Sequence, residues 1–261
     1  MHVLFLPEYP EREFYTIIPL FMHLGWFATQ DPSADFSFAI CWQDSTWLQP
    51  DPVLTELARH KPVVNQHCLD ISKQRVEREF FAETGRSTFV DPLTFSGRAV
   101  CKYNENARGG HLVDLPLLKP DPKFVYQRLI DATAAGSVVE YRVPVVLGTI
   151  PLVYRELKDI PHDQIKTRKQ SAQLCSADTV FSAAEIGQVL SFCRRMGLDF
   201  GELDILRSND DGQLYILDAN KTPGGLGIFN RVNWRQEQRM EVIAKLAAAF
   251  KSGIESRLGQ S

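Results

Sequence analysis

The feature that most restricts how this chain can fold is a pair of short apolar runs near its carboxyl-terminal end, GELDILR and QLYILDAN, joined by the turn-forming segment SNDDG. Runs of this kind, separated by so few residues, predict an antiparallel hairpin. If the turn is centred in SNDDG, Asp204 is expected opposite Asp218 or one diagonal step away from it. Because side chains alternate across a strand, one face of the second strand is expected to hold Leu214, Ile216, Asp218 and Asn220.

Two carboxylates and one amide oxygen would therefore converge at the end of this hairpin. Like charges that face each other across a strand pair are unfavourable unless a cation lies between them. Oxygen ligands with room for water and phosphate suit Mg²⁺, so Asp204, Asp218 and Asn220 are candidate metal ligands. The pattern leaves a second interpretation open, a surface hairpin whose acids are simply solvated.

Composition and length exclude several classes of protein. The 261 residues are 44% hydrophobic and 23% charged, which argues against disorder. A net charge of −3 provides no field that would attract nucleic acid or an anionic membrane. The longest apolar run, IIPLFMHLGWFA, is shorter than the roughly 20 residues that a membrane span needs. The first residues lack the basic segment of a signal peptide, so we expect a soluble, cytoplasmic protein without nucleic-acid or membrane partners.

The order of the remaining elements predicts an α+β chain. HVLFL and FSFAICW read as buried strands on either side of a helical segment, which gives a short α/β opening. GRAVCKY, GGHLVDL and KFVYQRLI read as further strands, and VVEYRVPVVLG with TIPLVYREL reads as a hairpin around Gly148. The segment KDIPHDQIKTRKQSAQLCSAD shows no periodicity and is expected to be a loop.

Three helices have clear sequence signals. One is expected over residues 72–84 and ends at Gly85. Another starts at Ser182, which forms a capping box with the glutamate three residues later. The last is expected over residues 235–258. The buried positions of these helices are expected at Val76, Phe80, Phe81, Ile186, Val189, Leu190, Cys193, Met196, Met240, Ile243, Leu246, Phe250 and Ile254.

The end of the hairpin resembles a known family. Asp204, followed by Asp218-x-Asn220 and then by Pro-Gly, is similar to the metal-binding end of ATP-grasp enzymes. The resemblance implies that these three residues hold the magnesium ions that bridge the phosphates of ATP, with Mn²⁺ as an alternative ion. The family usually has Glu where this chain has Asp218, but inositol-phosphate kinases of the same fold have Asp there.

Further segments follow in the family's order between about residues 60 and 230. VVNQHCLDISKQRVEREFF resembles the segment with a lysine at a helix start. RAVCKYNENARGGH resembles a strand that ends in a phosphate-binding lysine and leads into a loop. FVYQRLID resembles the strand that borders adenine, and EYRVPVV with PLVYREL resembles strands with basic residues near the transferred phosphoryl group. These segments imply that the nucleotide contacts Lys73, Lys102, Asn106, Gly109, Gly110, Gln127, Arg128, Leu129 and Ile130, with Arg142 and Arg155 at the reacting phosphate.

The implied ATP-grasp fold has two β-rich lobes that enclose ATP, preceded by a short α/β lobe. The expected divisions are residues 1–68 for this amino-terminal lobe, 69–132 for the central subdomain and 133–261 for the carboxyl-terminal subdomain with the metal site. The loop over residues 104–110 has no apolar anchor, so we expect it to be mobile until a nucleotide binds. No GxxxxGK[ST] segment is present and no GxGxxG follows a strand, which excludes P-loop and Rossmann sites.

The activity implied by the resemblance is that of a carboxylate–amine ligase, which phosphorylates a carboxylate and lets an amine displace the phosphate. One alternative is a small-molecule kinase of the same fold, favoured by LDAN and by Glu202, where D-alanine–D-alanine ligases have Arg. Another is a degenerate nucleotide-binding subunit. The sequence does not identify the acceptor, a small molecule or a peptide, whose recognition is expected in loops 104–115 and 156–178 or on a partner subunit. For the oligomeric state, the sequence leaves open both a homodimer and a complex with a partner subunit.

Overall fold

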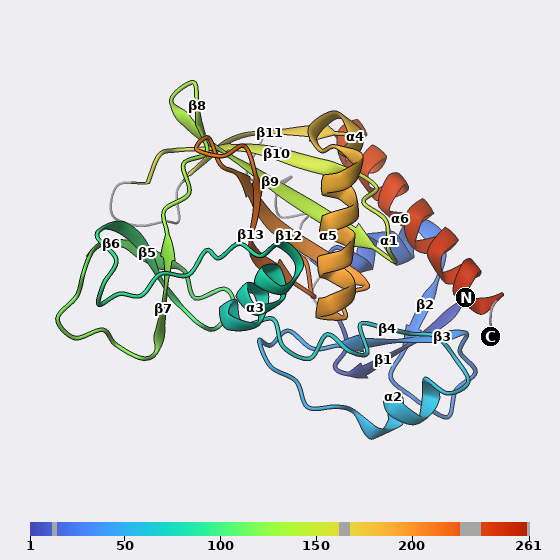
Figure 1. Ribbon diagram of the computed structural model, residues 1–261. Coiled ribbons are helices and arrows are strands. Elements are labelled where there is room, and N and C mark those ends of the chain that lie inside the picture. The colour runs from blue at the N-terminus through green and yellow to red at the C-terminus, as the bar shows by residue number, and fades with distance from the viewer. Residues whose placement is uncertain (12–14, 162–167, 225–235, 260–261) are drawn as a thin grey trace.

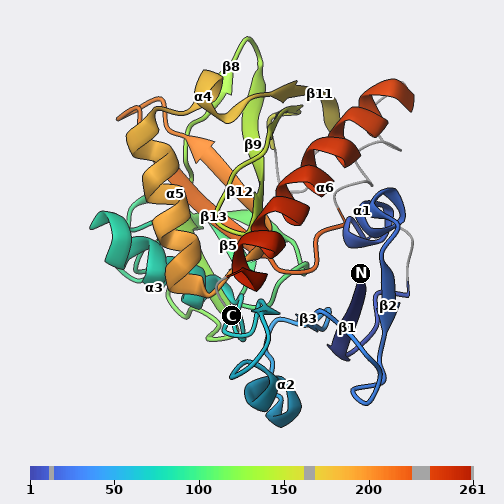
Figure 2. The same ribbon diagram turned by 90° about the vertical axis from the view of Figure 1, so that its right-hand side faces the viewer.

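The computed structural model describes residues 1–11, 15–161, 168–224 and 236–259. In this part of the chain, four, three and six strands form three separate β-sheets. The sheets follow one another along the sequence, and helices pack against the first and the last of them (Figures 1 and 2). This mixed architecture confirms the predicted α+β fold class.

The first sheet is parallel and has the strand order β2-β1-β3-β4. Its elements are β1 His2–Pro7, α1 Ile17–Leu24, β2 Phe27–Thr29, β3 Phe38–Trp42, α2 Pro52–Leu57 and β4 Val63–Val64. All residues of β3 are buried, as expected for a strand with parallel neighbours on both sides. The sheet is the short α/β lobe that the sequence predicts, with an edge strand, β2, that the sequence did not indicate.

The central sheet is antiparallel and has the strand order β6-β5-β7. Its strands are β5 Gly97–Tyr103, β6 Gly110–Leu115 and β7 Phe124–Arg128. Each lies within one of the three predicted runs. β5 is the middle strand, so its last residues, which line the cleft described below, are held by β6 on one side and β7 on the other.

Helix α3, Lys73–Thr84, precedes the central sheet. It begins where the Ser72 side chain accepts the backbone N–H of Arg75, and it ends at Gly85, whose φ of 69° lies in the left-handed region. The predicted burial of Phe81 is wrong, because its side chain is 54% exposed. Phe80 is the buried residue, and the next position lies about 100° further round the helix, on its solvent side.

The third sheet has the strand order β11-β10-β9-β12-β13, and β8 pairs with β9 outside this path. Its strands are β8 Thr133–Ala134, β9 Ser137–Val146, β10 Val153–Lys158, β11 Lys169–Cys175, β12 Phe200–Arg207 and β13 Leu214–Asn220. Both predicted hairpins, β9–β10 and β12–β13, are present. The prediction of a loop after β10 is wrong for the second half of that segment, where β11 forms an edge strand. An edge strand pairs on one side only, so the polar sequence KQSAQLC has no apolar alternation to reveal it.

The helices of the last part of the chain are α4 Ala177–Val180, α5 Ala183–Met196 and α6 Gln236–Leu258. The capping box at Ser182 is confirmed, and α5 ends at Gly197 with a left-handed φ of 67°. Phe192 is buried in α5, whereas the predicted Ile186 and Leu190 are only partly buried. In α6 the prediction for Met240 is wrong, because this side chain is 47% exposed one turn before the helix reaches the core at Val242 and Ile243.

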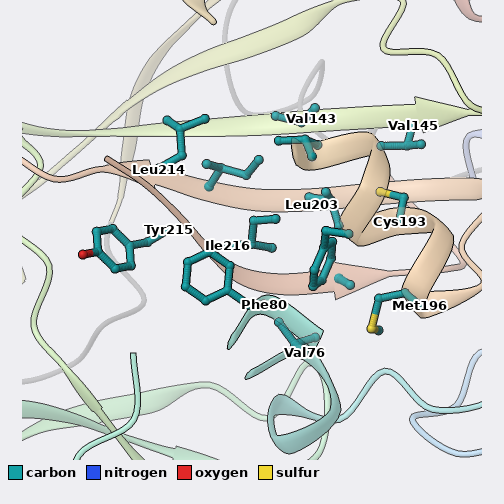
Figure 3. Close-up of a cluster of buried hydrophobic side chains, with 14 of the residues drawn as sticks. Val76, Phe80, Val143, Val145, Cys193, Met196, Leu203, Leu214, Tyr215 and Ile216 are labelled. Carbon is teal, nitrogen blue, oxygen red and sulfur yellow. The ribbon is translucent and has the colours of Figure 1, made fainter. Parts of the chain in front are cut away.

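Two large apolar clusters hold the lobes together. In the first, α1 and α6 cover one face of the parallel sheet, and Phe250 packs against Phe21, Phe38 and Phe200. In the second, α3 and α5 cover one face of the third sheet, with Phe80 and Tyr215 at a ring-centroid distance of 5.8 Å (Figure 3). Each such side chain stabilises the fold by about 1.5–3 kcal/mol when fully buried.

Packing crosses the divisions expected from the sequence. The three sheets lie within residues 1–68, 69–132 and 133–261, respectively. Helix α3, however, contacts α5 and β13, and α6 contacts α1 (Figures 1 and 2). The helices therefore join neighbouring lobes. Among the described helices, none combines the length and apolar character needed to cross a membrane.

Candidate functional site

A cleft with two chambers lies between the central sheet and the third sheet. The first chamber has a volume of about 450 Å³ and the second about 340 Å³. Four residues line both: Lys102 of β5, Glu140 of β9, Lys158 of β10 and Leu217 of β13. We call the first the charged chamber and the second the apolar chamber. The charged chamber is also lined by Lys73, Asn106, Ala107, Arg108, Gly109, Arg142, Glu202, Asp204, Asp218 and Asn220.

The β12–β13 hairpin supplies the acids of the charged chamber. In its register Asp204 lies opposite Asp218, and Glu202 lies opposite Asn220. This confirms the prediction that the two aspartates face each other across the hairpin. Directly opposite residues of an antiparallel pair have Cβ atoms about 4.5–5.5 Å apart, which is close enough for both carboxylates to share one cation.

A β-bulge changes the face on which part of β13 lies. Asp204 pairs with Asp218, whereas the next residue, Ile205, pairs with Ile216, so Leu217 has no residue opposite it. As a result Leu217 and Asp218 both line the cleft, and Ile216 packs in the core beneath α3 and α5 (Figure 3). The prediction that Ile216 shares the face of Asp218 is wrong, because strict alternation fails wherever a strand contains an extra residue.

Two cations from other elements neutralise these aspartates. Lys73 Nζ lies 2.7 Å from both Oδ1 and Oδ2 of Asp218, and 3.1 Å from Asn106 Oδ1. All three ammonium hydrogens are thereby engaged, and the lysine side chain is only 5% exposed. Arg142 Nε lies 3.0 Å from Asp204 Oδ1 and 3.7 Å from Glu202 Oε2. A lysine at the start of α3 opposes the helix dipole, and the ion pair with Asp218 offsets that cost.

The loop that contains Asn106 is anchored on two sides. The backbone O of Asn104 accepts the N–H of Lys73, and its Oδ1 accepts the N–H of Gln74. Asn106 N–H donates to Thr46 Oγ1 of the amino-terminal lobe. The loop thus has polar anchors, which the sequence analysis did not foresee, and its mobility without nucleotide stays a prediction.

The two loop glycines have different positions. Gly109 lines the charged chamber and has a φ of 74°, which places its backbone in the left-handed region that glycine tolerates. Gly110 is the first residue of β6 and pairs with Lys102. Only the first of these predicted phosphate-binding residues lines the cleft.

Burial and close charges shift the pKa values of the site. Burial alone would raise the pKa of Asp204, but the Arg142 guanidinium and the Lys158 ammonium lower it to about 2. Burial raises the pKa of Glu202 to about 7, although Arg142 partly opposes this. Burial also lowers the pKa of Lys102, with Asp218 acting in the opposite direction. The charged chamber thus holds closely coupled acids and bases in a poorly hydrated setting.

The donor set of the hairpin fits a hard divalent cation. Asp204 and Asp218 provide carboxylate oxygens, and Asn220 provides an amide oxygen that now accepts Thr222 N–H at 3.0 Å and Thr222 Oγ1 at 3.4 Å. Glu202 Oε1 is buried without a hydrogen-bond partner. No three His, Cys, Asp or Glu residues of the described ranges form a metal-binding group. A metal here would therefore depend on the amide and on ligand oxygens as well as on the two aspartates.

The apolar chamber lies beside the end of β7. All four residues predicted at the adenine edge, Gln127, Arg128, Leu129 and Ile130, line it. A cation–π contact holds the Arg128 side chain, because its guanidinium carbon lies 4.5 Å from the centre of the Tyr215 ring. The apolar walls are formed by Val100, Val138, Ile160, Leu206 and Leu217. Their shape and chemistry suit a flat, mostly apolar group.

The two arginines predicted near a reacting phosphate are on opposite faces of the sheet. Arg142 lines the charged chamber. Arg155 lies opposite Tyr141 and lines neither chamber. Tyr141 packs against Phe181 at a ring distance of 5.3 Å, in the core beneath α4 and α5. Because directly opposite residues point to the same side of a sheet, Arg155 points away from the cleft.

Sequence reasoning missed Glu140 and Lys158, which line both chambers and form an ion pair with each other. It also missed the buried Glu156 of β10, which forms an ion pair with Lys169 of β11. The available signal was the two-residue spacing of charges in EYR and ELK, which puts each pair on one face of a strand.

The fold is similar to solved structures of ATP-grasp ligases, while the sequence matches no family model and no curated protein. The ligase PsnB, solved with a minimal precursor, Mg and ADP, has a TM-score of 0.62 at 13% identity over 97% of this chain and 98% of that one. D-alanine–D-alanine ligase from Bacillus anthracis has a TM-score of 0.56 at 13% identity over 100% and 98%. The macrocyclase MdnC from Microcystis aeruginosa MRC, bound to the precursor peptide MdnA, has a TM-score of 0.53 at 11% identity over 95% and 98%.

Proposed function

Because the chain has the ATP-grasp fold, we propose that it is an ATP-dependent ligase that joins a carboxylate to an amine through an acyl phosphate. The observation that carries this proposal is the pair of facing aspartates, Asp204 and Asp218, in a chamber that opens onto an apolar one. ATP would place its base in the apolar chamber and its phosphates in the charged chamber. The four residues common to both chambers would lie near the ribose and the α-phosphate.

The charged chamber offers cations for each part of a triphosphate. Lys73 and Lys102 would neutralise phosphate charge, as would Lys158, which also faces the apolar chamber. Arg142 would reach the transferred phosphoryl group from its place between Asp204 and Glu202. Positioning and charge stabilisation of this kind supply most of the rate enhancement in phosphoryl transfer.

Asp204, Asp218 and Asn220 would hold Mg²⁺, with Mn²⁺ as an alternative. When bound, the ion would supply positive charge that offsets the negative charge of the phosphates during transfer. For the metal to bind, Lys73 has to exchange Asp218 for phosphate. Arg142, which donates to Asp204 Oδ1, has to share that carboxylate with the metal. Nucleotide and metal are therefore expected to bind together rather than one after the other.

The proposed reaction has two bond-making steps. An oxygen of the acceptor carboxylate attacks the γ-phosphorus, and the bond from that phosphorus to the ADP oxygen breaks. The nitrogen of a neutral amine then attacks the acyl carbon, the carbon–oxygen bond to phosphate breaks, and the nitrogen releases a proton.

The acceptor is proposed only as a class. PsnB and MdnC were each solved with a precursor peptide, which supports a peptide carboxylate. A kinase that stops at a stable phosphate ester is the second candidate. It is favoured by Glu202, an acid 3.7 Å from Arg142 at the position where, by the family resemblance, D-alanine–D-alanine ligases have Arg.

Hydroxylamine trapping separates these candidates. The protein would be incubated with ATP, Mg²⁺ and hydroxylamine, together with a panel of amino acids, peptides and sugar acids. A ligase is expected to release ADP and phosphate only with the right acid and to form its hydroxamate, which mass spectrometry identifies.

The other outcomes each point to a different function. ADP with a stable phosphate ester and no free phosphate would replace the ligase by a kinase. Tight binding of ADP and Mg²⁺ with no product from any acid or polyol would favour the nucleotide-binding subunit. A protein that does not bind ADP and Mg²⁺ at all would refute the proposed site.

A further inference from the structure

The charged chamber is lined by one carboxylate with an unsatisfied oxygen. Glu202 is 3% exposed, and its Oε1 has no hydrogen-bond partner among the residues that the structure describes. Its Oε2 lies 3.7 Å from Arg142 Nε, which is longer than a hydrogen bond. A buried charge is costly unless it is both paired and hydrogen-bonded. Glu202 is therefore more readily explained as a ligand contact than as a structural residue.

The strands on either side of Glu202 do not supply the missing donor. Opposite it on β9 lies Pro144, which has an apolar ring and no N–H. Opposite it on β13 lies Asn220, whose side-chain oxygen accepts Thr222 N–H at 3.0 Å. The next residue of β12, Leu203, packs in the core on the other face of the sheet. Glu202 thus lies on the chamber side with neighbours that leave its Oε1 unsatisfied.

The surrounding charges are one cation short. On the face that includes the cleft, strands β9 to β12 place four carboxylates close together, those of Glu140, Glu156, Glu202 and Asp204. The same strands supply three cations to this cluster, those of Arg142, Lys158 and Lys169. Each of these cations has its shortest ion pair with one of the other three acids. Glu202 is therefore the acid left without a cation of its own.

Binding of the nucleotide would increase this shortage. In the proposed function Arg142 reaches the transferred phosphoryl group, which would weaken its long contact with Glu202. A second metal ion fits this position poorly, because Glu202 belongs to no group of three metal-binding side chains in the described ranges. An organic ammonium ion fits better, since it carries its own N–H donors and can be held by a single carboxylate.

We propose that Glu202 forms a subsite for the alkylammonium group of the amine substrate. The inference deepens the proposed function and rests on it. A cation held by Glu202 would lie beside the phosphoryl group that Arg142 contacts, which is where the amine is needed to meet the acyl phosphate. Glu202 acts here in recognition, and no proton transfer is assigned to it. The amine class selected is therefore one that is charged in solution.

The first test measures binding without turnover. The protein is saturated with ADP and Mg²⁺ and titrated at pH 8 and constant ionic strength with propylammonium chloride, by calorimetry. Propan-1-ol, which has no charge, and tetramethylammonium, which has a charge but no N–H, are the comparison probes. The wild-type protein is expected to bind propylammonium at least tenfold more tightly than either of them.

Substitutions of Glu202 test the contact itself. Glu202→Gln keeps the shape but removes the charge, so propylammonium binding should weaken at least tenfold. Glu202→Asp keeps the charge on a shorter arm and should lose less than Glu202→Gln. Glu241→Gln makes the same change on the exposed side of α6 and should keep the wild-type affinity. Binding of ADP with Mg²⁺ by each variant checks that the chamber is intact.

A second test uses the charge of the nucleophile. Hydroxylamine is mainly uncharged at pH 8, whereas propylamine is almost entirely the ammonium ion. With the acid found in the hydroxylamine screen, Glu202→Gln should raise the KM for propylamine at least tenfold and change the KM for hydroxylamine by no more than about twofold. A merely structural role for Glu202 would raise both KM values together.

The outcomes separate this inference from the function on which it rests. If propylammonium binds to the wild type no more tightly than propan-1-ol or tetramethylammonium, the inference is overturned and the nucleotide site stands. Equal propylammonium affinities of the wild type and Glu202→Gln overturn it as well. A wild-type protein that does not bind ADP and Mg²⁺, or one that yields only a stable phosphate ester, refutes the proposed ligase itself.

Discussion

The two chambers of the cleft satisfy their polar groups in different ways. In the charged chamber nearly every charge already has a partner, since Lys73 pairs with Asp218 and Arg142 with Asp204. In the apolar chamber most lining side chains are apolar, and two buried polar atoms, Gln127 Oε1 and Arg128 Nε, have no hydrogen-bond partner among the described residues. A ligand in the first has to replace existing contacts, whereas a ligand in the second adds one.

This difference suggests how affinity and selectivity are divided. Exchange of one ion pair for another gains little net free energy, because desolvation and charge attraction nearly cancel at buried pairs. The charged chamber should therefore position phosphates and depend strongly on the metal. The apolar chamber should contribute area-dependent affinity and base selection. Three substitutions test this division, in order of decreasing expected effect.

Asp218→Ala should abolish turnover while leaving the protein folded, since it removes one of the two facing carboxylates. Stabilisation by ATP with Mg²⁺ in a thermal melt should be lost at the same time. Asp114→Ala is a matched control, because Asp114 of β6 is 88% exposed and lies outside both chambers. Equal activity and equal thermal shifts in Asp218→Ala and wild type would remove Asp218 from the site.

Lys102→Met should weaken ADP binding by about 1.5–3 kcal/mol, which is roughly 10–150-fold, because it removes a charge-assisted contact to phosphate. Adenosine, which would occupy only the apolar chamber, should bind within about twofold of wild type. Calorimetry with both ligands measures the contrast, and Lys245→Met on the exposed face of α6 serves as the control. A parallel loss for adenosine would show that the chambers do not act separately.

Arg155→Ala should change turnover by no more than about twofold, because its side chain lies on the sheet face away from the cleft. Arg142, on the neighbouring strand β9, lies opposite Tyr154 and lines the charged chamber, so Arg142→Ala should lower turnover by at least the roughly 10²-fold typical of lost charge stabilisation. Steady-state rates of the two variants give the comparison. A large loss in Arg155→Ala would contradict the assignment of faces.

How far the sequence predicted the site depends on the range of the contacts involved. Asp204 and Asp218 are joined by a short turn, so alternation and turn length were sufficient to place them opposite each other. The bulge at Leu217 was not predictable in this way, because LYIL is apolar throughout and therefore does not show which residue is the extra one. Lys73, far from the hairpin in sequence, was found only through the resemblance to a family.

Other parts of the site depend on the exact register of strands or on contacts between distant residues. Glu140 and Lys158 meet because the hairpin strands β9 and β10 pair in one particular register. The orientation of Gln127 depends on Glu77 and Thr88, which lie about 40–50 residues earlier in the chain. The charge spacing in EYR and ELK marks a face of each strand, but neither the register of that hairpin nor the contacts of Gln127 can be read from a local pattern.

The cluster that joins α1, α6 and the parallel sheet has a consequence for synthesis on the ribosome. Its members range from Val3 to Ile254, so β1 and α6, which are far apart in the sequence, share one core. Until α6 emerges, Phe21, Phe38 and their neighbours have no cover on that side. During this interval the nascent amino-terminal lobe would expose aromatic surface of the kind that chaperones bind. Completion of this lobe therefore waits for translation of α6, which follows the third sheet in the sequence.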